Sequence, residues 1–571
     1  MINNSDPFSD IALTFSGGGF RAAGFCLGVL SYMNKVEHDG QPLLNRVKYI
    51  STVSGGTITG AAYALKAAEG KSFEAIYEEI FAFLQGRQFL DDSLRFLEDD
   101  SCWQGRRKSL IKSFSKGYDA LVGDARLMDI QTSQTHIEGV TFNATEFNTG
   151  LPFRFQNEGL LGNLKIAKND RDLEAARELV LLKDIIAASS CFPFGFEPIM
   201  FPDDFIPSHH EVYKRLKDKA HYRSGMGLMD GGIVDNQGLN AVSSAQRRRV
   251  RSSVPHNKFS LLMINDVASH YMNPWVGTEE NYKRPVNHST LESLNISRFL
   301  PAALSGKFNW LFYLLLVVLA ASVAWLLPAN GPVETGGIIF LSLLAGVIIT
   351  FLVSKRIINR IIIKKVNSLK GKLLSKIPEF YLPLLSNFDE LKIGLLERML
   401  QERISSVFLM VTEVFLKQVR RLNYKVIYRD KKWDFMRITN TIYELTPRDL
   451  AYQYENNRFG DHSSVIRKKE KELVVQVSEE MKEVATRASN MGTTLWFEKK
   501  HEKALHDLIA CGQFTTCFNL LTYLIELEHH PESPCKDLFN ADAPLTLLRK
   551  RLEDDWKTFL KTPGFMLNQS R

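Results

Sequence analysis

The sequence lacks the patterns of cysteine, histidine and N-terminal residues that define several protein classes. Its six cysteines lie far apart, none forms a CxxC pair, and no histidine cluster has zinc spacing. We therefore expect reduced and mostly buried thiols. The opening residues MINNSDPFSD contain no basic region followed by an apolar stretch, so we expect no signal peptide and a cytoplasmic N-terminal part.

Repeats, low-complexity runs and a strong charge imbalance are also missing. The net charge of +7 over 571 residues is a modest basic excess, and no interleaving of arginine with aromatic residues favours a nucleic-acid partner. Charged residues make up 24% of the chain and hydrophobic residues 45%, which argues against wholesale disorder and allows a sizeable core.

Apolar strands alternate with helical segments through the first half of the chain. The pattern predicts strands at 10–15, 47–53 and 259–266, a strand ending at Asp230, a hairpin at 140–156, and helices at 22–36, 55–70 and 174–190. This alternation indicates an α/β sandwich with a mostly parallel central sheet.

Two uncharged runs, 310–327 and 336–353, are each long enough to cross the hydrocarbon of a bilayer. The loop between them has no Lys or Arg, whereas 354–365 is strongly basic, so both chain ends are expected in the cytoplasm. We expect a multi-pass hairpin with transmembrane helices at about 309–328 and 336–354. A buried hairpin in a soluble protein is the alternative.

Amphipathic helix follows the hairpin. Residues 354–365 are expected along the inner membrane surface, and residues 382–421 form a long amphipathic helix with one break. Strand character returns in YKVIYRD (424–430), and from Lys469 the pattern is mostly helical. Homo-oligomers could form through the membrane spans or the long helix.

The first motif that could take part in catalysis or binding is SGGGFRAAG, which follows a buried strand. The amides of Gly17, Gly18 and Gly19 can point at an anion at the helix N-terminus, either an oxyanion or a phosphate. The spacing Gly17-x-Gly19-x-x-Ala22, with Glu37 beyond it, also fits a dinucleotide fingerprint. A purely structural glycine turn is the third alternative.

The second motif is ISTVSGGTITG, in which a strand ends at Ser54 and a helix begins. A nucleophile elbow needs this order, with small residues two before and two after the serine. Here those positions hold Thr52 and Gly56, so either the turn opens slightly or the helix carries small residues. A serine N-cap of an ordinary helix is the alternative.

The third motif is MDGGIVDNQG. Asp230 ends a short apolar strand, and Gly231 and Gly232 let the chain turn away at once, which presents the carboxylate at the strand end. A plain Asp-Gly turn is the alternative, with Asp235 and Asn236 in turn or capping roles. A hydroxyl, a carboxylate and backbone donors at strand ends together suit acyl transfer.

The stretches FSGGGFRAAGFCLGVL, ISTVSGGTITGA, CFPFGFEP and LMDGGIVDNQGL resemble the patatin-like phospholipases, particularly the bacterial ones. EFNTGLPFRF looks like the family's sheet hairpin, and YKVIYRD and TTLWF…LIACG look like its closing elements. The resemblance implies a three-layer sandwich and a Ser–Asp dyad that works without histidine, metal or organic cofactor.

Carried over by position, the resemblance implies Ser54 as nucleophile and Asp230 as its base. It further implies Gly17, Gly18 and Gly19 as the oxyanion loop, with Arg21, Gly56, Gly231 and Gly232 in support. The implied domains are a first catalytic part at 1–290, an inserted membrane region at 291–422, a closing part at 423–520 and a helical tail at 521–571.

The resulting expectation is a membrane-anchored serine hydrolase that cleaves acyl esters of membrane phospholipids, located in the bacterial inner membrane. Its partners are the lipid bilayer and its phospholipid substrate. Two alternatives remain. One is a catalytically silent patatin-like protein that senses lipid or acts as a scaffold, and the other is a membrane-linked oxidoreductase that binds a dinucleotide.

Overall fold

The computed structural model describes two units of the chain. The described residues are 6–85, 88–103, 107–131, 134–163, 165, 170–193, 195–251, 258–269, 271, 393–455, 464–494, 497 and 502–567. Residues 1–272 and 412–571 make one compact unit, and residues 273–411 make the other, of which helix α16 (Ile393–Leu409) is described. The expected membrane helices at 309–328 and 336–354 lie outside the described residues.

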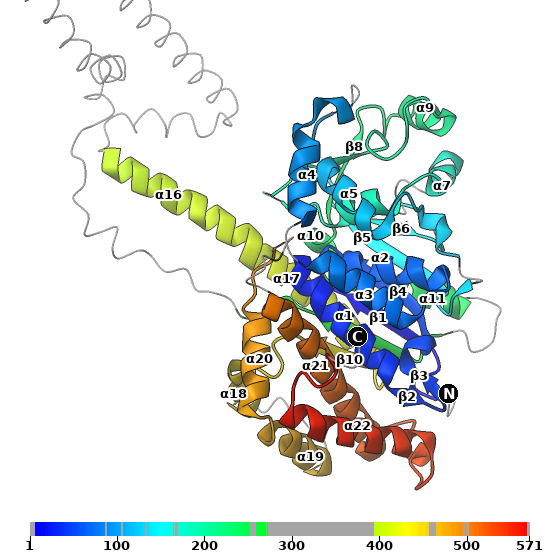
Figure 1. The fold of residues 1–571 in the computed structure, drawn as a ribbon, viewed down its shortest axis with the longest axis vertical. Coiled ribbons are helices and arrows are strands. Elements are labelled where there is room, and N and C mark those ends of the chain that lie inside the picture. The colour runs from blue at the N-terminus through cyan, green and yellow to red at the C-terminus, as the bar shows by residue number, and fades with distance from the viewer. Residues whose placement is uncertain are drawn as a thin grey trace, which may run out of the picture. The chain divides into compact units, whose positions relative to one another are not determined.

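The first unit is built on an eight-stranded sheet with the strand order β10-β9-β1-β4-β5-β8-β7, and β6 pairs with β5 (Figure 1). Strands β10 (Arg437–Thr441), β9 (Leu261–Asp266), β1 (Ile11–Phe15), β4 (Val47–Val53) and β5 (Gly139–Glu146) are parallel neighbours. Strands β6 (Leu151–Gln156), β7 (Ile199–Phe201) and β8 (Met226–Asp230) add antiparallel pairs. The expected mostly parallel sheet and the hairpin at 140–156 are confirmed.

Helices cover both faces of this sheet. Ile11, Leu13 and Phe15 of β1 join a core cluster with residues of α1 (Gly19–Lys35), α2 (Gly55–Ala68) and α21 (Glu502–His529). Ala12 points the other way and joins a second cluster with residues of α11 (Leu239–Arg251) and α17 (Leu416–Arg429). Because successive strand residues face opposite sides, this split defines a three-layer arrangement.

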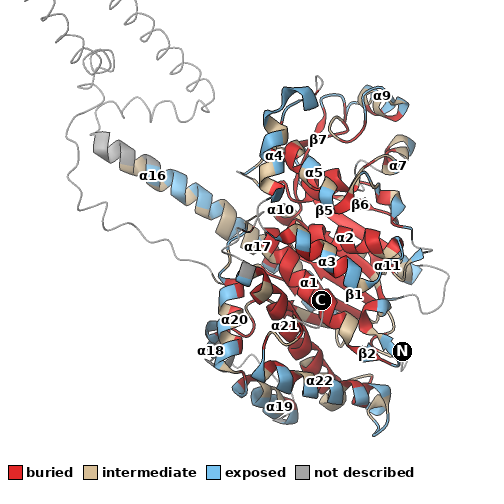
Figure 2. Ribbon diagram, viewed as in Figure 1, coloured by how far each residue is buried: buried red, intermediate tan, exposed pale blue. Residues whose placement is uncertain are grey.

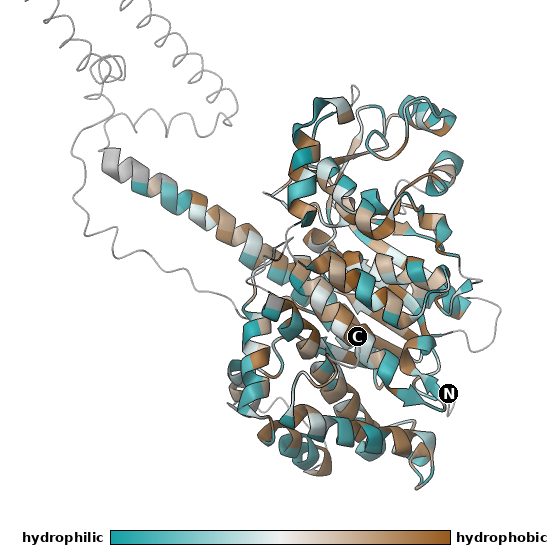
Figure 3. Ribbon diagram, viewed as in Figure 1, coloured by the Kyte–Doolittle hydropathy of each residue, from teal (hydrophilic) through white to brown (hydrophobic). Residues whose placement is uncertain are grey.

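Helix α21 is the central helix of the C-terminal part. A Cβ on Gly28 of α1 would lie 2.1 Å from the Ile509 carbonyl oxygen, so the α1 and α21 backbones touch. Among the described residues, Lys503–His529 is the single helix long and apolar enough to span a bilayer, yet 94% of its most apolar window is buried. Burial is greatest in α1, α2, α21 and the strands, where apolar residues concentrate, and peripheral helices such as α9 (Glu211–Asp218) are mostly polar (Figures 2 and 3).

Two expectations about secondary structure were wrong. Residues 424–430 are not a strand, because all of them except Asp430 belong to α17. Arg420 and Tyr424 lie one helical turn apart on α17, and both side chains reach the Asp266 carboxylate. The expected helix at 174–190 is broken into α7 (Arg171–Arg177) and α8 (Leu182–Ser189). The break exists because the Leu182 amide donates to the Ala125 carbonyl at 2.8 Å, a contact that sequence periodicity does not encode.

A buried ion pair joins β9 to α17. The Arg420 Nε donates to the Asp266 carboxylate at 2.8 Å, and the Tyr424 hydroxyl and Gln237 amide donate to the same oxygen at 2.8 and 3.1 Å. Asp266 is fully buried and Arg420 is 7% exposed. The pair therefore ties the chain after residue 412 to a strand of the N-terminal part.

Removing one partner would leave a buried, unpaired charge. We expect Arg420→Met to lower the free energy of unfolding by about 3–5 kcal/mol in urea titrations of the full-length protein. The exposed neighbour Arg421→Met is the matched control and should change it by less than about 0.5 kcal/mol. Equal effects of the two substitutions would contradict a structural role for the pair.

Candidate active site

Strands β4 and β8 lie end to end along one edge of β5. Val53 of β4 pairs in parallel with Asn143, and Asp230 of β8 pairs in antiparallel with the next residue, Ala144. Strand β6 pairs with both Asn143 and Ala144 and so occupies the opposite edge. The two chain directions converge, which places the end of β4 and Asp230 about one strand residue, ~3.3 Å, apart along β5.

The direction of β8 was not expected. The sequence pattern placed all three motifs at the carboxyl ends of strands in a mostly parallel sheet. Asp230 does end β8, but β8 runs antiparallel to its neighbour β5. Asp230 still reaches the same level as Ser54, because β8 pairs only with the last three residues of β5, beyond the end of β4.

Ser54 occupies the sharp turn between β4 and α2. Its φ of 51° and ψ of −125° place a residue with a side chain in a region that favours glycine. Its amide donates to the Ser189 hydroxyl at 2.9 Å, and Ser54 as a whole is 7% exposed. This strained strand-turn-helix geometry is that of a nucleophile elbow.

Thr52 fits into this elbow because the helix opposite carries glycine. A Cβ on Gly60 of α2 would lie 2.4 Å from the Thr52 methyl carbon, so only a glycine leaves room for the threonine. Gly56 is equally constrained, since a Cβ there would lie 2.7 Å from the Phe15 carbonyl oxygen. Of the two solutions that the sequence allowed, small residues in the helix account for Thr52.

Asp230 lies buried at the end of β8, with 4% of its surface exposed. Burial raises the pKa of its carboxyl from the ordinary value of 3.8 to about 6, although hydrogen bonds from the Ser54 side chain and the Gly232 amide lower it. The Gly232 amide donates to Asp230 Oδ1 at 2.6 Å. Gly231 lies flat against β5, where a Cβ would come within 2.4 Å of the Asn143 carbonyl oxygen.

The glycine loop faces Ser54, but only part of it has free amides. A Cβ on Gly17 would lie 3.1 Å from the Ser54 Cβ, so the loop lies against the serine side chain. The Gly17 amide donates to the Asn236 carbonyl at 3.0 Å, which corrects the expectation that all three amides serve an oxyanion. Within the described part of the chain, the amides of Gly18 and Gly19 have no protein acceptor.

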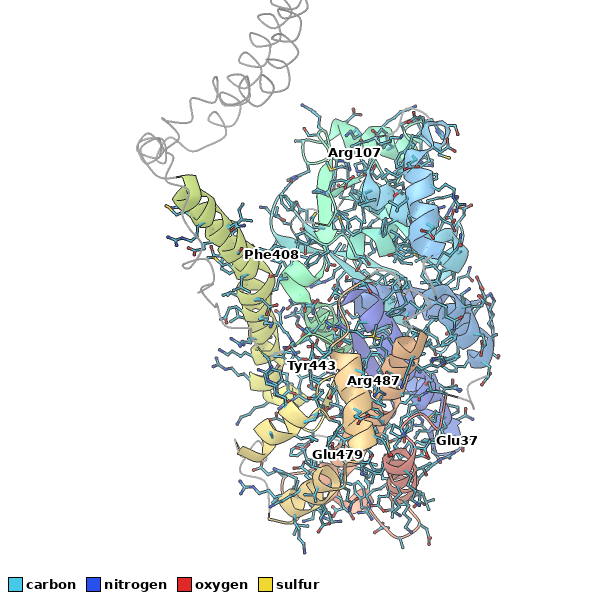
Figure 4. All side chains as sticks on the ribbon, turned by 60° about the vertical axis from the view of Figure 1, so that its left-hand side comes forward. Glu37, Arg107, Phe408, Tyr443, Glu479 and Arg487 are labelled. Atoms are coloured by element: carbon cyan, nitrogen blue, oxygen red, sulfur yellow. The ribbon has the colours of Figure 1, made fainter. Side chains whose placement is uncertain are left out.

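Arg21 fastens the start of α1 to the C-terminal part of the unit rather than to the glycine loop. Its guanidinium donates to the Met491 carbonyl at 2.8 Å, and the Phe20 amide donates to the Thr494 carbonyl at 2.7 Å. This 491–494 segment follows α20 (Glu479–Ser489), whose Arg487 makes two hydrogen bonds, 2.7 and 3.0 Å, with Asp507 of α21 (Figure 4).

The residues on which the alternative interpretations depend take no part in the Ser54 and Asp230 site. Asp235 accepts the Asn240 amide at 2.7 Å at the start of α11, as its expected capping role requires. Glu37 lies in β2 (Glu37–His38) of a separate two-stranded sheet and pairs with Arg551. Helix α1 separates Glu37 from the glycine loop by about 25 Å, which does not fit a dinucleotide site. No described His, Cys, Asp or Glu side chains form a group of three suited to a metal.

Sequence reasoning missed several residues that support the elbow. Ser189 accepts the Ser54 amide, and the Asn143 side chain donates to the Thr52 carbonyl and the Ser51 hydroxyl, each at 3.0 Å. The available signal was the pair of hydroxyl residues that closes the apolar run of α8 just before CFPFGFEP.

Comparison with known proteins gives one family match. Residues 13–242, less than half of the chain, match the model of the family described as patatin-like phospholipase. A comparison with curated protein sequences gives no match.

Solved structures with some similarity include human GIVD cytosolic phospholipase A2. One such structure, in complex with methyl gamma-linolenyl fluorophosphonate and terbium chloride, is 20% identical, with 26% of this chain and 23% of that chain covered and a TM-score of 0.21. Another structure of the same human protein is 13% identical, covers 50% of this chain and 51% of its own, and has a TM-score of 0.28. VipD from Legionella pneumophila is 11% identical, with 97% and 92% covered and a TM-score of 0.22.

The chain thus spans no more than about half the length of the two human structures. At these TM-scores the domain assignment rests on the family model alone. Residues 13–242 of this chain form a patatin-like phospholipase domain.

Proposed function

We propose that the chain is a membrane-anchored lipid acyl hydrolase that cleaves acyl esters of membrane phospholipids with a Ser54–Asp230 dyad. The observation that carries the proposal is the strand register that brings the end of β4 and the buried Asp230 about one strand residue apart along β5, with Ser54 at a strained elbow beside the glycine loop. The match of residues 13–242 to the patatin-like family supports the substrate class.

In this mechanism Asp230 takes the hydroxyl proton of Ser54 while the serine oxygen attacks the ester carbonyl carbon. The amides of Gly18 and Gly19, together with the N-terminus of α2, stabilise the negative charge of the tetrahedral intermediate. The intermediate collapses, Asp230 returns the proton to the leaving alcohol, and a lysolipid departs. Water then attacks the acyl-enzyme with Asp230 as base, which releases the fatty acid and restores Ser54.

Asp230 is suited to act as a base without histidine. A raised pKa of about 6 makes the carboxylate a stronger base than an ordinary aspartate, yet leaves it ionised at neutral pH. Among the described residues, no histidine contributes to the shift in the pKa of the Asp230 carboxyl.

Membrane anchoring is proposed from the sequence. The uncharged runs at 310–327 and 336–353 and the basic segment at 354–365 favour two spans with both chain ends in the cytoplasm. An anchor of this kind would hold the active site beside its substrate. Self-association through the spans or the long helix belongs to the same proposal.

Ser54→Ala removes the nucleophile and Asp230→Ala removes the base. Each should lower fatty-acid release from phospholipid vesicles by at least about a thousandfold, with an unchanged circular dichroism spectrum. A fluorophosphonate probe should label the wild type at Ser54 and leave Ser54→Ala unlabelled. Activity of Ser54→Ala at the wild-type level would remove the dyad, and a wild type that neither hydrolyses lipid nor takes up the probe would favour the silent scaffold.

The rate should depend on pH through Asp230. Because the base acts as a carboxylate, kcat/KM should rise with pH and level off above an apparent pKa of about 6. Initial rates on a soluble 4-nitrophenyl ester between pH 4.5 and pH 8 measure the profile. A flat profile across pH 5–7 would contradict Asp230 as the base.

The same burial should make the ionised form of Asp230 unfavourable in the folded state. Because the folded-state pKa is raised, the protonated carboxyl stabilises the fold at acid pH, and this stabilisation is lost as pH rises through about 6. The difference in unfolding free energy between Asp230→Asn and wild type should therefore shift by about 2 kcal/mol in favour of the variant from pH 4 to pH 7. The exposed Asp218→Asn is the control and should show no such shift.

A further inference from the structure

The Ser189 hydroxyl lies at the centre of the hydrogen bonds that support the elbow. It accepts the Ser54 amide at 2.9 Å, lies 2.8 Å from the Thr57 hydroxyl, and donates to the Asn143 carbonyl at 2.7 Å. Ser189 is fully buried at the end of α8, and Asn143 is the β5 residue opposite the end of β4. One side chain thus connects the nucleophile, the helix behind it and the strand beside it.

The direction of these hydrogen bonds is fixed by proton count. Ser189 has one hydroxyl proton, and it is donated to Asn143, so Thr57 must donate to Ser189. Thr57 in turn accepts from the Thr52 hydroxyl at 2.9 Å. The relay therefore runs from Thr52 through Thr57 and Ser189 to the Asn143 carbonyl, and the Ser189 oxygen has both of its acceptor positions filled.

The segment that begins at Ser189 also holds the strand end that carries the carboxylate. The Asp230 amide donates to the Cys191 carbonyl at 2.9 Å, and the Gly231 amide donates to the Ser189 carbonyl at 3.4 Å. Residues 189–191 therefore accept a hydrogen bond from the Ser54 amide through a side chain, and hydrogen bonds from the amides of Asp230 and Gly231 through carbonyl groups. The relative position of the two functional groups depends on this segment.

We propose that Ser189 is a positioning residue for the acyl-transfer reaction, and that the Thr52–Thr57–Ser189 relay holds Ser54 in its strained conformation with its hydroxyl against Asp230. This inference rests on the proposed function of the Ser54–Asp230 pair. It also gives Thr52 a role: the residue that departs from the strict elbow pattern supplies the first hydroxyl of the relay.

The physical reason is the cost of freeing the Ser54 amide. A residue at φ 51° stays there only while its surroundings hold it, and the Ser189 oxygen is the acceptor for its only backbone donor. Without that acceptor a buried amide is unsatisfied and the turn can relax. A displacement of the serine oxygen by about 1 Å is enough to lower a reaction rate about 100-fold.

Ser189→Ala is the direct test, with kcat and KM measured on a soluble 4-nitrophenyl ester. We expect kcat to fall roughly 10- to 100-fold with KM changed by less than about twofold, because the substrate contacts remain. Ser31→Ala is the matched control: Ser31 is buried on α1, donates to the Gly28 carbonyl at 2.9 Å and accepts from Gln513 at 2.9 Å. Ser31→Ala should keep the wild-type kcat even if it lowers the free energy of unfolding as much as Ser189→Ala does.

A second pair of variants tests the relay if Ser189→Ala does not fold. Thr57→Val keeps the shape of a fully buried side chain but cannot donate to Ser189, whereas Thr57→Ser keeps the hydroxyl. We expect kcat to fall about three- to tenfold in Thr57→Val and to stay within twofold of wild type in Thr57→Ser.

Any one of three results would overturn the inference. These are a wild-type kcat in a folded Ser189→Ala, a fall in kcat of Ser31→Ala equal to that of Ser189→Ala, and equal kcat values in the two Thr57 variants. Those results would leave the dyad untouched, provided that Ser54→Ala is inactive. An active Ser54→Ala would instead remove the proposed function itself, so the two failures are distinguishable.

Discussion

The site depends on one feature of the sheet: two strands that run toward each other along the same edge of β5. Hydrogen-bond register fixes how far each strand extends, because Asn143 pairs with Val53 and Ala144 pairs with Asp230. A shift of one residue in either strand would move Ser54 or Asp230 by about 3.3 Å and turn the paired side chains to the other face. The backbone ladder therefore sets the separation of hydroxyl and carboxylate before any side chain is considered.

Burial gives this geometry its chemistry. In a buried site a carboxylate loses part of its hydration, so its pKa rises and it becomes a better proton acceptor for the serine. The same low dielectric makes each unpaired donor expensive, so the turn that carries Ser54 is surrounded by hydrogen-bonded hydroxyl groups. The hydrogen bonds among these hydroxyl groups therefore accompany the strained backbone of Ser54 and help to hold it in place.

The C-terminal part of the chain completes the fold around the N-terminal motifs. Strand β10 pairs with β9, Arg420 neutralises the buried Asp266, and the 491–494 segment accepts hydrogen bonds from the first turn of α1, directly beside the glycine loop. The patatin-like match ends at residue 242, yet the loop that faces Ser54 is held by residues far beyond it. Fold and site are therefore properties of the whole first unit.

Sequence alone determined the local features: the buried strands before Gly17 and Ser54, the helices after them, the hairpin at 140–156 and the candidate residues Ser54 and Asp230. These follow from periodicity and from glycine positions, which act over a few residues. Only the tertiary structure decided the antiparallel direction of β8, the break between α7 and α8, the helical state of 424–429 and the loss of the Gly17 amide to Asn236. Each of those depends on a partner remote in the chain, and a local pattern carries no record of which partner satisfies a backbone group.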